Sequence, residues 1–241
     1  MTNALTLDLW NSILPLAGLS ALVAWLPGWF AGAGCLSQRV LAWAVGSEPA
    51  VLAGLSFGGL ASLHFAARQL ARVRGLLLIA SGPGFKNRDA AARWQERSNR
   101  TAEYIETKGF DAFVRGKAGP TCIGSDPELP AARAAAAAIR AQDPTSVGLF
   151  GRQVAGAAPS VIDELRGIRR PALVIVGEHD SGFLRAAEVM ADKLPDARSE
   201  TIPNAGHILN IEVAPAFNAR VVGFLDTLRR AGPSEGTPKE R

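Results

Sequence analysis

Residues 50–59 read AVLAGLSFGG, and this stretch decides the fold of the chain. The apolar run 50–55 has the length of a buried strand, and a helical pattern begins at Phe57. So abrupt a change from strand to helix holds Ser56 in a strained backbone conformation with its hydroxyl clear of the sheet. The residues two before and two after it must be small, and Gly54 and Gly58 meet that need. Ser56 is therefore a candidate nucleophile, with a surface serine in a glycine turn as the alternative, because the five-residue pattern alone also arises by chance.

Short apolar runs bounded by turn residues recur on both sides of this stretch. Strands that are apolar along their whole length are typical of a parallel sheet covered on both faces. We expect strands at 19–25, 50–55, 74–80 and 172–177, and a weaker one at 197–202. Helical patterns separate them at 6–17, 37–45, 57–70, 183–194 and 213–230. This alternation predicts an α/β fold, a mostly parallel sheet with helices on both faces.

The alternation stops between Gly82 and Arg169, where the pattern is helical and no strand-like run occurs. Helices are expected at 87–108, 110–115, 130–141 and, in pieces, 144–167. We therefore predict a core made of residues 1–85 and 168–231, a helical cap at 86–167 inserted over one edge of the sheet, and a disordered tail at 232–241.

Two later elements carry groups that could work with Ser56. The strand 172–177 ends in Glu178-His179-Asp180, which places Asp180 at the carboxyl edge of the sheet, where catalytic groups collect in α/β folds. His207 lies in a loop before the last helix. The alternatives are a turn carboxylate that caps the following helix and a solvated loop histidine. A serine hydroxyl needs an imidazole to take its proton and a carboxylate to orient that imidazole, so Ser56, Asp180 and His207 are the predicted catalytic residues.

The chain resembles the α/β-hydrolase superfamily over about residues 19–230. The matching pieces are LPG at 26–28, GLSFGG at 54–59, RVRGLLLIASGPG at 72–84, GEHD at 177–180 and GHILNIEVAPAFN at 206–218. The order Ser56, Asp180, His207 is the chain order of that superfamily's triad. Within it the chain is most similar to the branch that acts on small substrates: enol-lactonases, C–C bond hydrolases, cofactor-free haloperoxidases and small carboxylesterases.

The resemblance implies Ser56 as nucleophile, His207 as general base and then acid, and Asp180 as the acid that orients it. The backbone N–H of Phe57 would be one oxyanion donor, and Trp29, after LPG, is a candidate wall of the substrate pocket. Trp94 and Phe150 in the cap are further candidates for substrate contact. The family's second oxyanion donor comes from a His-Gly loop upstream of the helix at 6–17, and this sequence has no counterpart. We expect either a true start upstream of Met1 or a degenerate relative, and we favour the first.

Composition excludes several other functions. The 26 Lys and Arg residues against 22 Asp and Glu leave a net charge of only +4, too scattered for nucleic-acid binding. No dinucleotide or phosphate loop and no metal-ligand spacing occurs, so we expect no cofactor and no metal. The uncharged run at 13–35 lacks a preceding basic residue and is cut by prolines and glycines, which argues against a membrane segment. The two cysteines suit a reducing cytoplasm, and a homodimer is left open.

The sequence thus predicts a serine hydrolase. Its expected partner is its substrate, a small ester, lactone or related carbonyl compound. Two alternatives stay open. One is a lyase or synthase of the same fold that uses the triad for proton abstraction. The other is an inactive relative that lacks the second oxyanion donor. His179 and His64 are interpreted as structural, the latter as a hydrogen-bonded core residue.

Overall fold

The computed structural model of the chain describes residues 49–231. Several predictions lie outside these residues: the strand at 19–25, the helices at 6–17 and 37–45, Trp29 and the tail at 232–241. Residues 49–85 and 168–231 of the predicted core, the helical insertion at 86–167 and the residues predicted to be catalytic lie within them.

Within residues 49–231 the sheet has four strands in the spatial order β1-β2-β3-β4, and all of them are parallel, in agreement with the predicted mostly parallel sheet. Their bounds are β1 (Ala50–Leu55), β2 (Val73–Ile79), β3 (Ala172–Gly177) and β4 (Ala197–Ile202). The register pairs Leu55 with Ile79 and Ile79 with Ile175, so the carboxyl ends of β1, β2 and β3 lie at one edge. The loops that follow β1 and β3 therefore meet at this edge.

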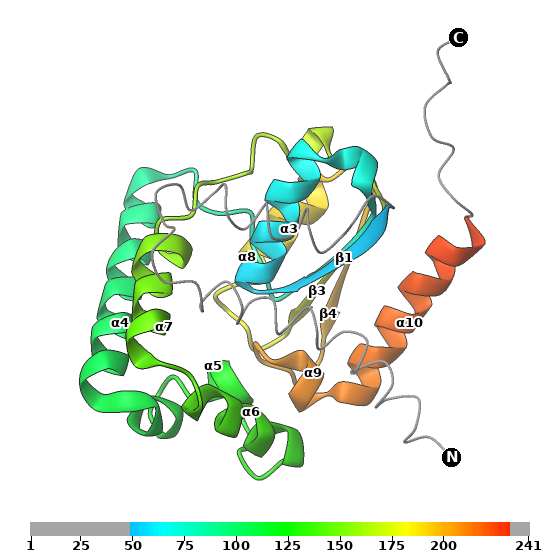
Figure 1. Cartoon of the computed structure of the whole chain (residues 1–241). Helices are drawn as coiled ribbons and strands as arrows, with labels where there is room; N and C mark the ends of the chain where they lie inside the picture. Colours follow the sequence, from blue (N-terminus) through cyan, green and yellow to red (C-terminus); the bar gives the residue numbers. More distant parts are fainter. Residues whose placement is uncertain (1–48, 232–241) are drawn as a thin grey trace.

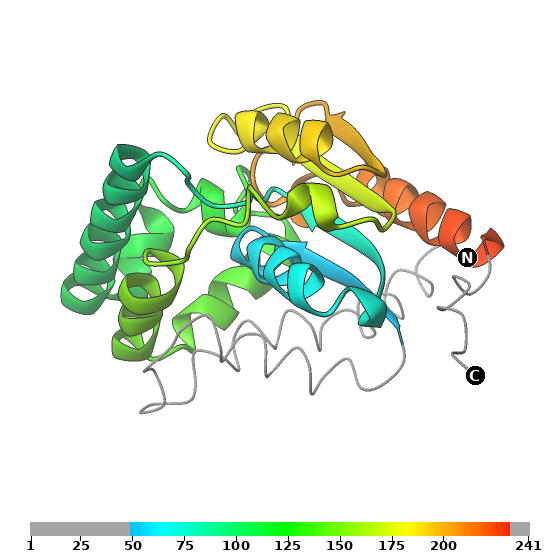
Figure 2. The same ribbon diagram turned by 90° about the horizontal axis from the view of Figure 1, so that it is seen from above.

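Helices cover both faces of the sheet. Successive residues of a strand point to opposite faces, so each strand contributes side chains to the core on both sides of the sheet. On one face, Val174 and Val176 pack with α3 (Phe57–Arg68) and α8 (Leu184–Lys193). On the other, Leu173 and Ile175 pack with α10 (Ala214–Arg230). Figures 1 and 2 show α3 and α8 on one side of the strands and α10 on the other. All six residues of β3 are buried, as a central strand covered on both faces requires.

The segment between β2 and β3 is helical, and we call its residues 86–167 the cap. It holds α4 (Arg88–Arg115), α5 (Pro120–Ile123), α6 (Pro130–Arg140), α7 (Pro144–Phe150), a π-helical turn η2 (Gly151–Ala155) and a 3₁₀ turn η3 (Leu165–Gly167). Helix α4 is kinked at Gly109, which has φ 76° and ψ 170°, at the break predicted between residues 108 and 110. Figures 1 and 2 show α4 and α7 side by side, at one end of the sheet.

The two ends of the cap are joined at a narrow neck. The carbonyl oxygen of Pro83 accepts a hydrogen bond from the backbone N–H of Val161 at 2.8 Å. Gly84 has φ +80°, and a Cβ built there would lie 2.8 Å from Cα of Ser160. The chain thus leaves the sheet and returns to it through two segments in direct contact.

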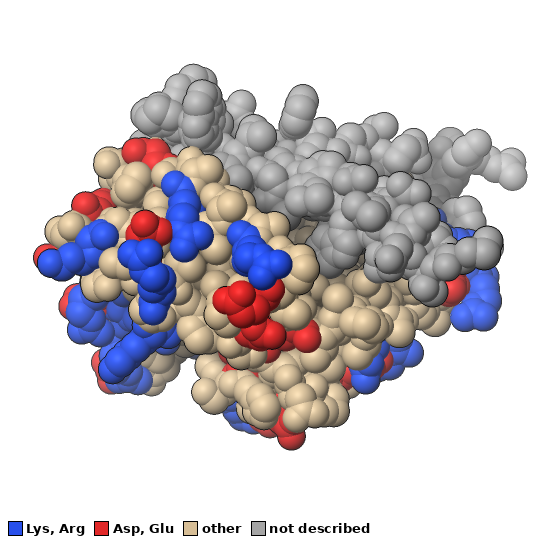
Figure 3. Space-filling view, turned by 90° about the horizontal axis from the view of Figure 1, so that it is seen from below, with Lys and Arg blue, Asp and Glu red and all other residues tan. Residues whose placement is uncertain are grey.

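Ion pairs connect the helices of the cap with each other. Arg140 of α6 pairs with Asp111 of α4 at 2.6 Å, and Arg152 of η2 donates to Glu106 of α4 at 2.7 Å. On the face drawn in Figure 3, Lys and Arg side chains are interspersed with Asp and Glu. These oppositely charged residues therefore offset each other where the helices of the cap meet.

His64 lies inside α3 and is buried, with 9% of its surface exposed, as predicted for a core histidine. Its Nε2–H donates to the Pro159 carbonyl at 3.0 Å, and its Nδ1 accepts from Arg68 at 3.2 Å. Burial lowers the pKa of His64, the bond to Pro159 opposes this, and the Arg68 charge lowers the pKa further. A neutral imidazole therefore joins α3 to the segment that returns from the cap.

This histidine makes stability depend on pH. Because the pKa of His64 is lower in the folded chain, the unfolded chain gains the proton first as the pH falls. We expect the free energy of unfolding to decrease as the pH falls below about 6.5, by at most about 1.4 kcal/mol per pH unit from this group. Urea unfolding at about pH 8 and about pH 5.5 measures the effect. His64→Gln should weaken this dependence and His179→Gln, on an exposed side chain, should leave it unchanged; equal slopes in all three proteins would contradict the assignment.

Candidate active site

Ser56 lies between β1 and α3 in a backbone conformation that few side chains adopt, with φ 53° and ψ −118°. Both of its peptide groups are held. Its N–H donates to the Ile79 carbonyl at 2.8 Å, and its carbonyl accepts from the Ser81 hydroxyl at 2.7 Å. The neighbouring strand thus stabilises a conformation that would otherwise cost free energy, as is common at functional sites.

The glycines around Ser56 are required by close backbone approach. A Cβ built on Gly54 would lie 2.2 Å from the carbonyl carbon of Gly58. One built on Gly59 would lie 2.3 Å from Oγ of Ser81. The predicted need for a small residue at 54 is confirmed, and Gly59 allows α3 to pack closely against Ser81.

Gly54→Ala is therefore expected to destabilise the fold by about 3 kcal/mol or more, because the atoms it meets are backbone and cannot move aside. Urea unfolding of the purified variant measures this. Gly223→Ala in α10 is the matched control, since a Cβ there meets nothing within 4 Å. It should raise stability by about 0.5–1 kcal/mol, because alanine favours a helix interior. Similar unfolding midpoints for Gly54→Ala and the wild type would contradict the tight turn.

The turn after β3 and the loop before His207 are packed directly on each other. A Cβ built on Gly177 would lie 2.2 Å from the carbonyl oxygen of Gly206, so only glycine fits at the end of β3. The backbone N–H of His179 donates to the Ala205 carbonyl at 2.8 Å. Two segments far apart in the sequence are thereby fixed together at the carboxyl edge of the sheet.

At this contact His207 and Asp180 meet. Nδ1 of His207 lies 2.8 Å from Oδ2 of Asp180, and the exposed fractions of the two side chains are 12% and 9%. The Nδ1–H donates to the carboxylate, which fixes the tautomer and leaves Nε2 free to accept a proton. Helix α8 begins at Leu184, and no side chain caps its N-terminus. The alternative interpretation of Asp180, as the cap of this helix, is therefore wrong.

The structure places Ser56 at the same edge of the sheet, after β1, two strands away from the turn that carries Asp180. His179 lies apart from the Asp180–His207 pair. Its side chain is 64% exposed, and its Nε2 is 3.8 Å from Glu178. Ser56, His207 and Asp180 thus lie in segments that follow strands ending at the same edge of the sheet.

Phe183 is a neighbour of His207 that the sequence did not indicate. Its ring centroid lies 4.9 Å from that of the imidazole, at an interplanar angle of 30°. Its backbone N–H donates to the Asp180 carbonyl at 2.9 Å, so one turn carries both the carboxylate and the ring. The imidazole is therefore restricted by the carboxylate at Nδ1 and by an aromatic ring against its plane.

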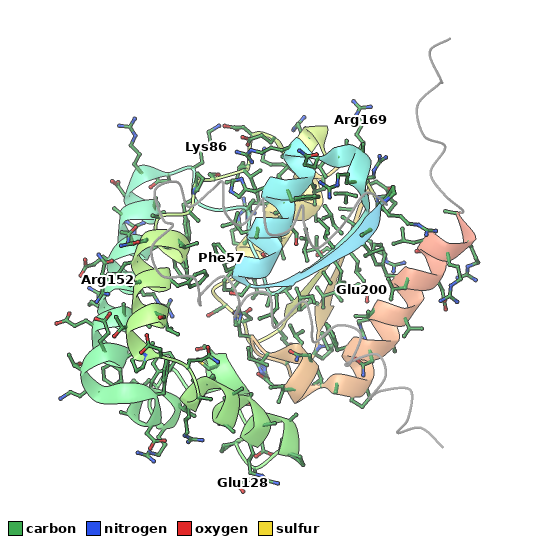
Figure 4. All side chains as sticks on the ribbon, in the orientation of Figure 1. Phe57, Lys86, Glu128, Arg152, Arg169 and Glu200 are labelled. Carbon is green, nitrogen blue, oxygen red and sulfur yellow. The ribbon has the colours of Figure 1, made fainter. Side chains whose placement is uncertain are left out.

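Phe57 connects the turn at Ser56 to the cap. Its ring packs edge-on against Phe150 of α7, with centroids 5.1 Å apart and an interplanar angle of 85°. Figure 4 shows Phe57 at the start of α3, on the side toward α7. Because Phe57 is the first residue of α3, its N–H has no intrahelical carbonyl to bind and is one of the donors that a helix N-terminus presents.

Trp94, another cap residue proposed for substrate contact, is used inside the cap. Its Nε1–H donates to the Ala155 carbonyl at 2.9 Å, and its ring lies 5.8 Å from that of Phe85. This bond holds the π-helical turn against α4. Phe150 directly precedes that turn, so Trp94 supports the segment that follows Phe150.

Within 49–231, no group of three or more His, Cys, Asp or Glu side chains is arranged to hold a metal ion. In the same part of the chain, no helix has both the length and the apolar character needed to cross a membrane.

Known proteins resemble this chain in both sequence and structure. A Bacillus subtilis (strain 168) protein with the provisional name 2-succinyl-6-hydroxy-2,4-cyclohexadiene-1-carboxylate synthase is 27% identical over 180 residues, which are 73% of this chain and 66% of that protein. Carboxylesterase YbfK from the same organism is 28% identical over 191 residues, 75% of this chain and 59% of its own. The structure of the enol-lactonase from Burkholderia xenovorans LB400 matches with a TM-score of 0.69 and 25% identity, and covers 83% of this chain and 75% of the lactonase.

The match to the two curated relatives thus covers less than two thirds of the length of each. A sequence model described as "Alpha/beta hydrolase family" matches residues 8–220, most of the chain. That span includes the turn at Ser56, the turn that carries Asp180 and the loop of His207. The chain belongs to the alpha/beta hydrolase family.

Proposed function

We propose that this protein is a serine hydrolase of a small ester, a lactone or a related carbonyl compound. The observation that carries the proposal is the 2.8 Å contact between His207 Nδ1 and Asp180 Oδ2, at the sheet edge where Ser56 occupies a strained turn. A carboxylate that fixes the imidazole tautomer is what a serine nucleophile needs from its base. Membership of a family with an esterase and a lactonase among the relatives supports it further.

In this reaction Ser56 Oγ attacks the substrate carbonyl while Nε2 of His207 takes the hydroxyl proton. Asp180 stabilises the imidazolium that forms, through the Nδ1–H bond. The N–H of Phe57 donates to the oxyanion of the tetrahedral intermediate. His207 then returns its proton to the leaving alkoxide. Water, deprotonated by His207, next cleaves the acyl-enzyme to the acid and restores Ser56.

The cap, residues 86–167, would cover this site, and Phe150 beside Phe57 would form part of the wall against which the acyl group binds. A mostly apolar wall suits a small, uncharged substrate. The proposed partner is that substrate alone, without cofactor, metal or nucleic acid. The proposed compartment is the cytoplasm.

A synthase or lyase activity is the second candidate. The relative with the provisional name of a cyclohexadiene carboxylate synthase favours it. There the same Ser56, His207 and Asp180 would serve to remove a proton next to a carbonyl rather than to transfer an acyl group. Such an enzyme would not turn over p-nitrophenyl acetate, whereas the proposed hydrolase would.

A fluorophosphonate probe tests the proposal directly. We expect covalent labelling of the full chain, located at Ser56 by peptide mass spectrometry, together with turnover of p-nitrophenyl esters or simple lactones. Labelling without ester or lactone turnover would favour the synthase. Absence of labelling in a folded protein would contradict a serine nucleophile in either role.

A further inference from the structure

The loop that leads to His207 is fastened at three successive residues. The N–H of Asn204 donates to Oε2 of Glu178 at 2.9 Å, and the Ala205 carbonyl accepts from the N–H of His179 at 2.8 Å. The N–H of Gly206 donates to Oε2 of Glu212 at 2.6 Å. The last of these bonds is one residue from the imidazole, so it has the most direct control over where His207 lies.

Glu212 differs from Glu178 in its surroundings. The Glu178 side chain is 54% exposed, and solvent screens its bond. In Glu212, Oε1 is buried and has no hydrogen-bond partner among residues 49–231. Burying a carboxylate oxygen without a hydrogen-bond partner costs free energy, and the structure keeps the Glu212 carboxylate beside Gly206 despite this cost. The charged bond to the Gly206 N–H is the contact that offsets it.

Glu212 also lies where the cap contacts the core. It ends the short helix α9 (Leu209–Glu212), which begins two residues after His207. A Cβ built on Gly124, just after α5 of the cap, would lie 3.0 Å from Cγ of Glu212. The preceding Ile211 packs against the apolar cluster formed by α4, α5 and α6. Leu209, at the other end of the same helix, is fully buried in the core against the sheet.

One helical turn therefore touches the sheet, the cap and the loop of the proposed base. We propose that Glu212 is a positioning residue for His207 and that, through it, the placement of α5 in the cap controls the alignment of the imidazole. This inference rests on the proposed function. It assigns no contact with substrate to Glu212, which would act only through the Gly206 N–H and the loop.

Glu212→Ala and Glu212→Gln test the positioning role. Alanine removes the acceptor, and we expect the rate of fluorophosphonate labelling and kcat for an ester to fall about 10- to 100-fold, with KM little changed, because a small misplacement of the base slows the chemistry. Glutamine keeps an oxygen that accepts from Gly206 and should restore most of the rate. Equal losses in both folded variants would overturn the proposal, since the acceptor would then not be what matters.

Two glycine variants test the link to the cap. Gly124 and Gly109 both have positive φ, +91° and +76°, so alanine strains the backbone at either position. A Cβ at 124 presses on Glu212, whereas one at 109 meets nothing within 4 Å. We expect both variants to lower Tm, and only Gly124→Ala to slow labelling, by about 10-fold. Equal labelling rates in the two variants would exclude control by the cap.

A readout without turnover separates this inference from the proposed function. The Nδ1–H proton of His207, which Asp180 accepts, is expected to give a low-field proton NMR resonance in the intact chain. It should persist in Glu212→Gln and broaden or disappear in Glu212→Ala, even if the wild type is not labelled and the hydrolase proposal fails. If the wild type is labelled, and a folded Glu212→Ala keeps both this resonance and the wild-type labelling rate, the positioning role alone is overturned.

Discussion

Ser56→Ala should lower kcat/KM for any hydrolysed ester by about 10⁴-fold or more, and should abolish fluorophosphonate labelling. The reason is that no other group at the turn can form the acyl-enzyme, so only polarisation of the carbonyl by the Phe57 N–H would remain. The thermal midpoint should not fall, because alanine keeps the Cβ and the backbone hydrogen bonds of residue 56 to Ile79 and Ser81 remain. Steady-state kinetics and a thermal melt on the same preparation measure both quantities.

Ser62→Ala is the matched control for this variant. Ser62 lies in the same helix, is buried, and donates to the Gly58 carbonyl at 2.8 Å. Its loss should cost about 1 kcal/mol of stability and leave labelling intact. Full labelling of Ser56→Ala would locate the nucleophile elsewhere and end the hydrolase proposal in its present form.

Asp180→Asn has the second large effect, a fall in kcat of about 10⁴-fold. The amide is the same size as the carboxylate, but its NH₂ group can turn toward Nδ1 of His207. The imidazole would then carry its proton on Nε2, where it cannot accept one from serine. Kinetics with the best ester found for the wild type, supported by loss of the Nδ1–H resonance, measure the change.

Asp163→Asn is the control for a carboxylate that only forms a surface ion pair. Asp163 pairs with Lys86 at 2.7 Å, with 70% of its side chain exposed. Its replacement should leave kcat unchanged and alter stability by less than about 1 kcal/mol. A loss of less than about 10-fold in Asp180→Asn would mean that the carboxylate does not set the tautomer of the base.

The sequence predicted the parts of the fold that depend on local pattern. The ranges expected for β1, β3 and β4 agree with the structure residue for residue. For β1 and β3 the reason is that an apolar run bounded by turn residues is typical of a buried strand, whereas β4 is mostly polar and gave a weaker pattern. The break in α4 at Gly109 and the tight turn at Ser56 were also predicted, since glycine and backbone strain have local causes. The boundaries of β2 and α3 shifted by one or two residues, as they do where a strand or helix frays into a turn.

The rest of the site depends on contacts between distant segments, which a local pattern does not contain. Phe183, three residues after Asp180, reads as the start of an amphipathic helix, and only the fold brings its ring to His207. Glu212 lies just before the predicted helix at 213–230, and its bond to Gly206 depends on how α9 turns back on the loop. The pairing of Phe57 with Phe150 joins residues of core and cap that share no sequence pattern.

The neck formed by Pro83 and Val161 has a consequence for how such proteins change over evolution. Because the outgoing and returning segments already touch there, everything beyond the neck can be lengthened, shortened or exchanged without moving β2 or β3. The proposed catalytic residues stay on the sheet, while the cap, which is proposed to line the substrate site, can vary independently of them. A chimera that grafts the helices of another family member onto this neck should fold, and should take its preference among carbonyl compounds from the donor.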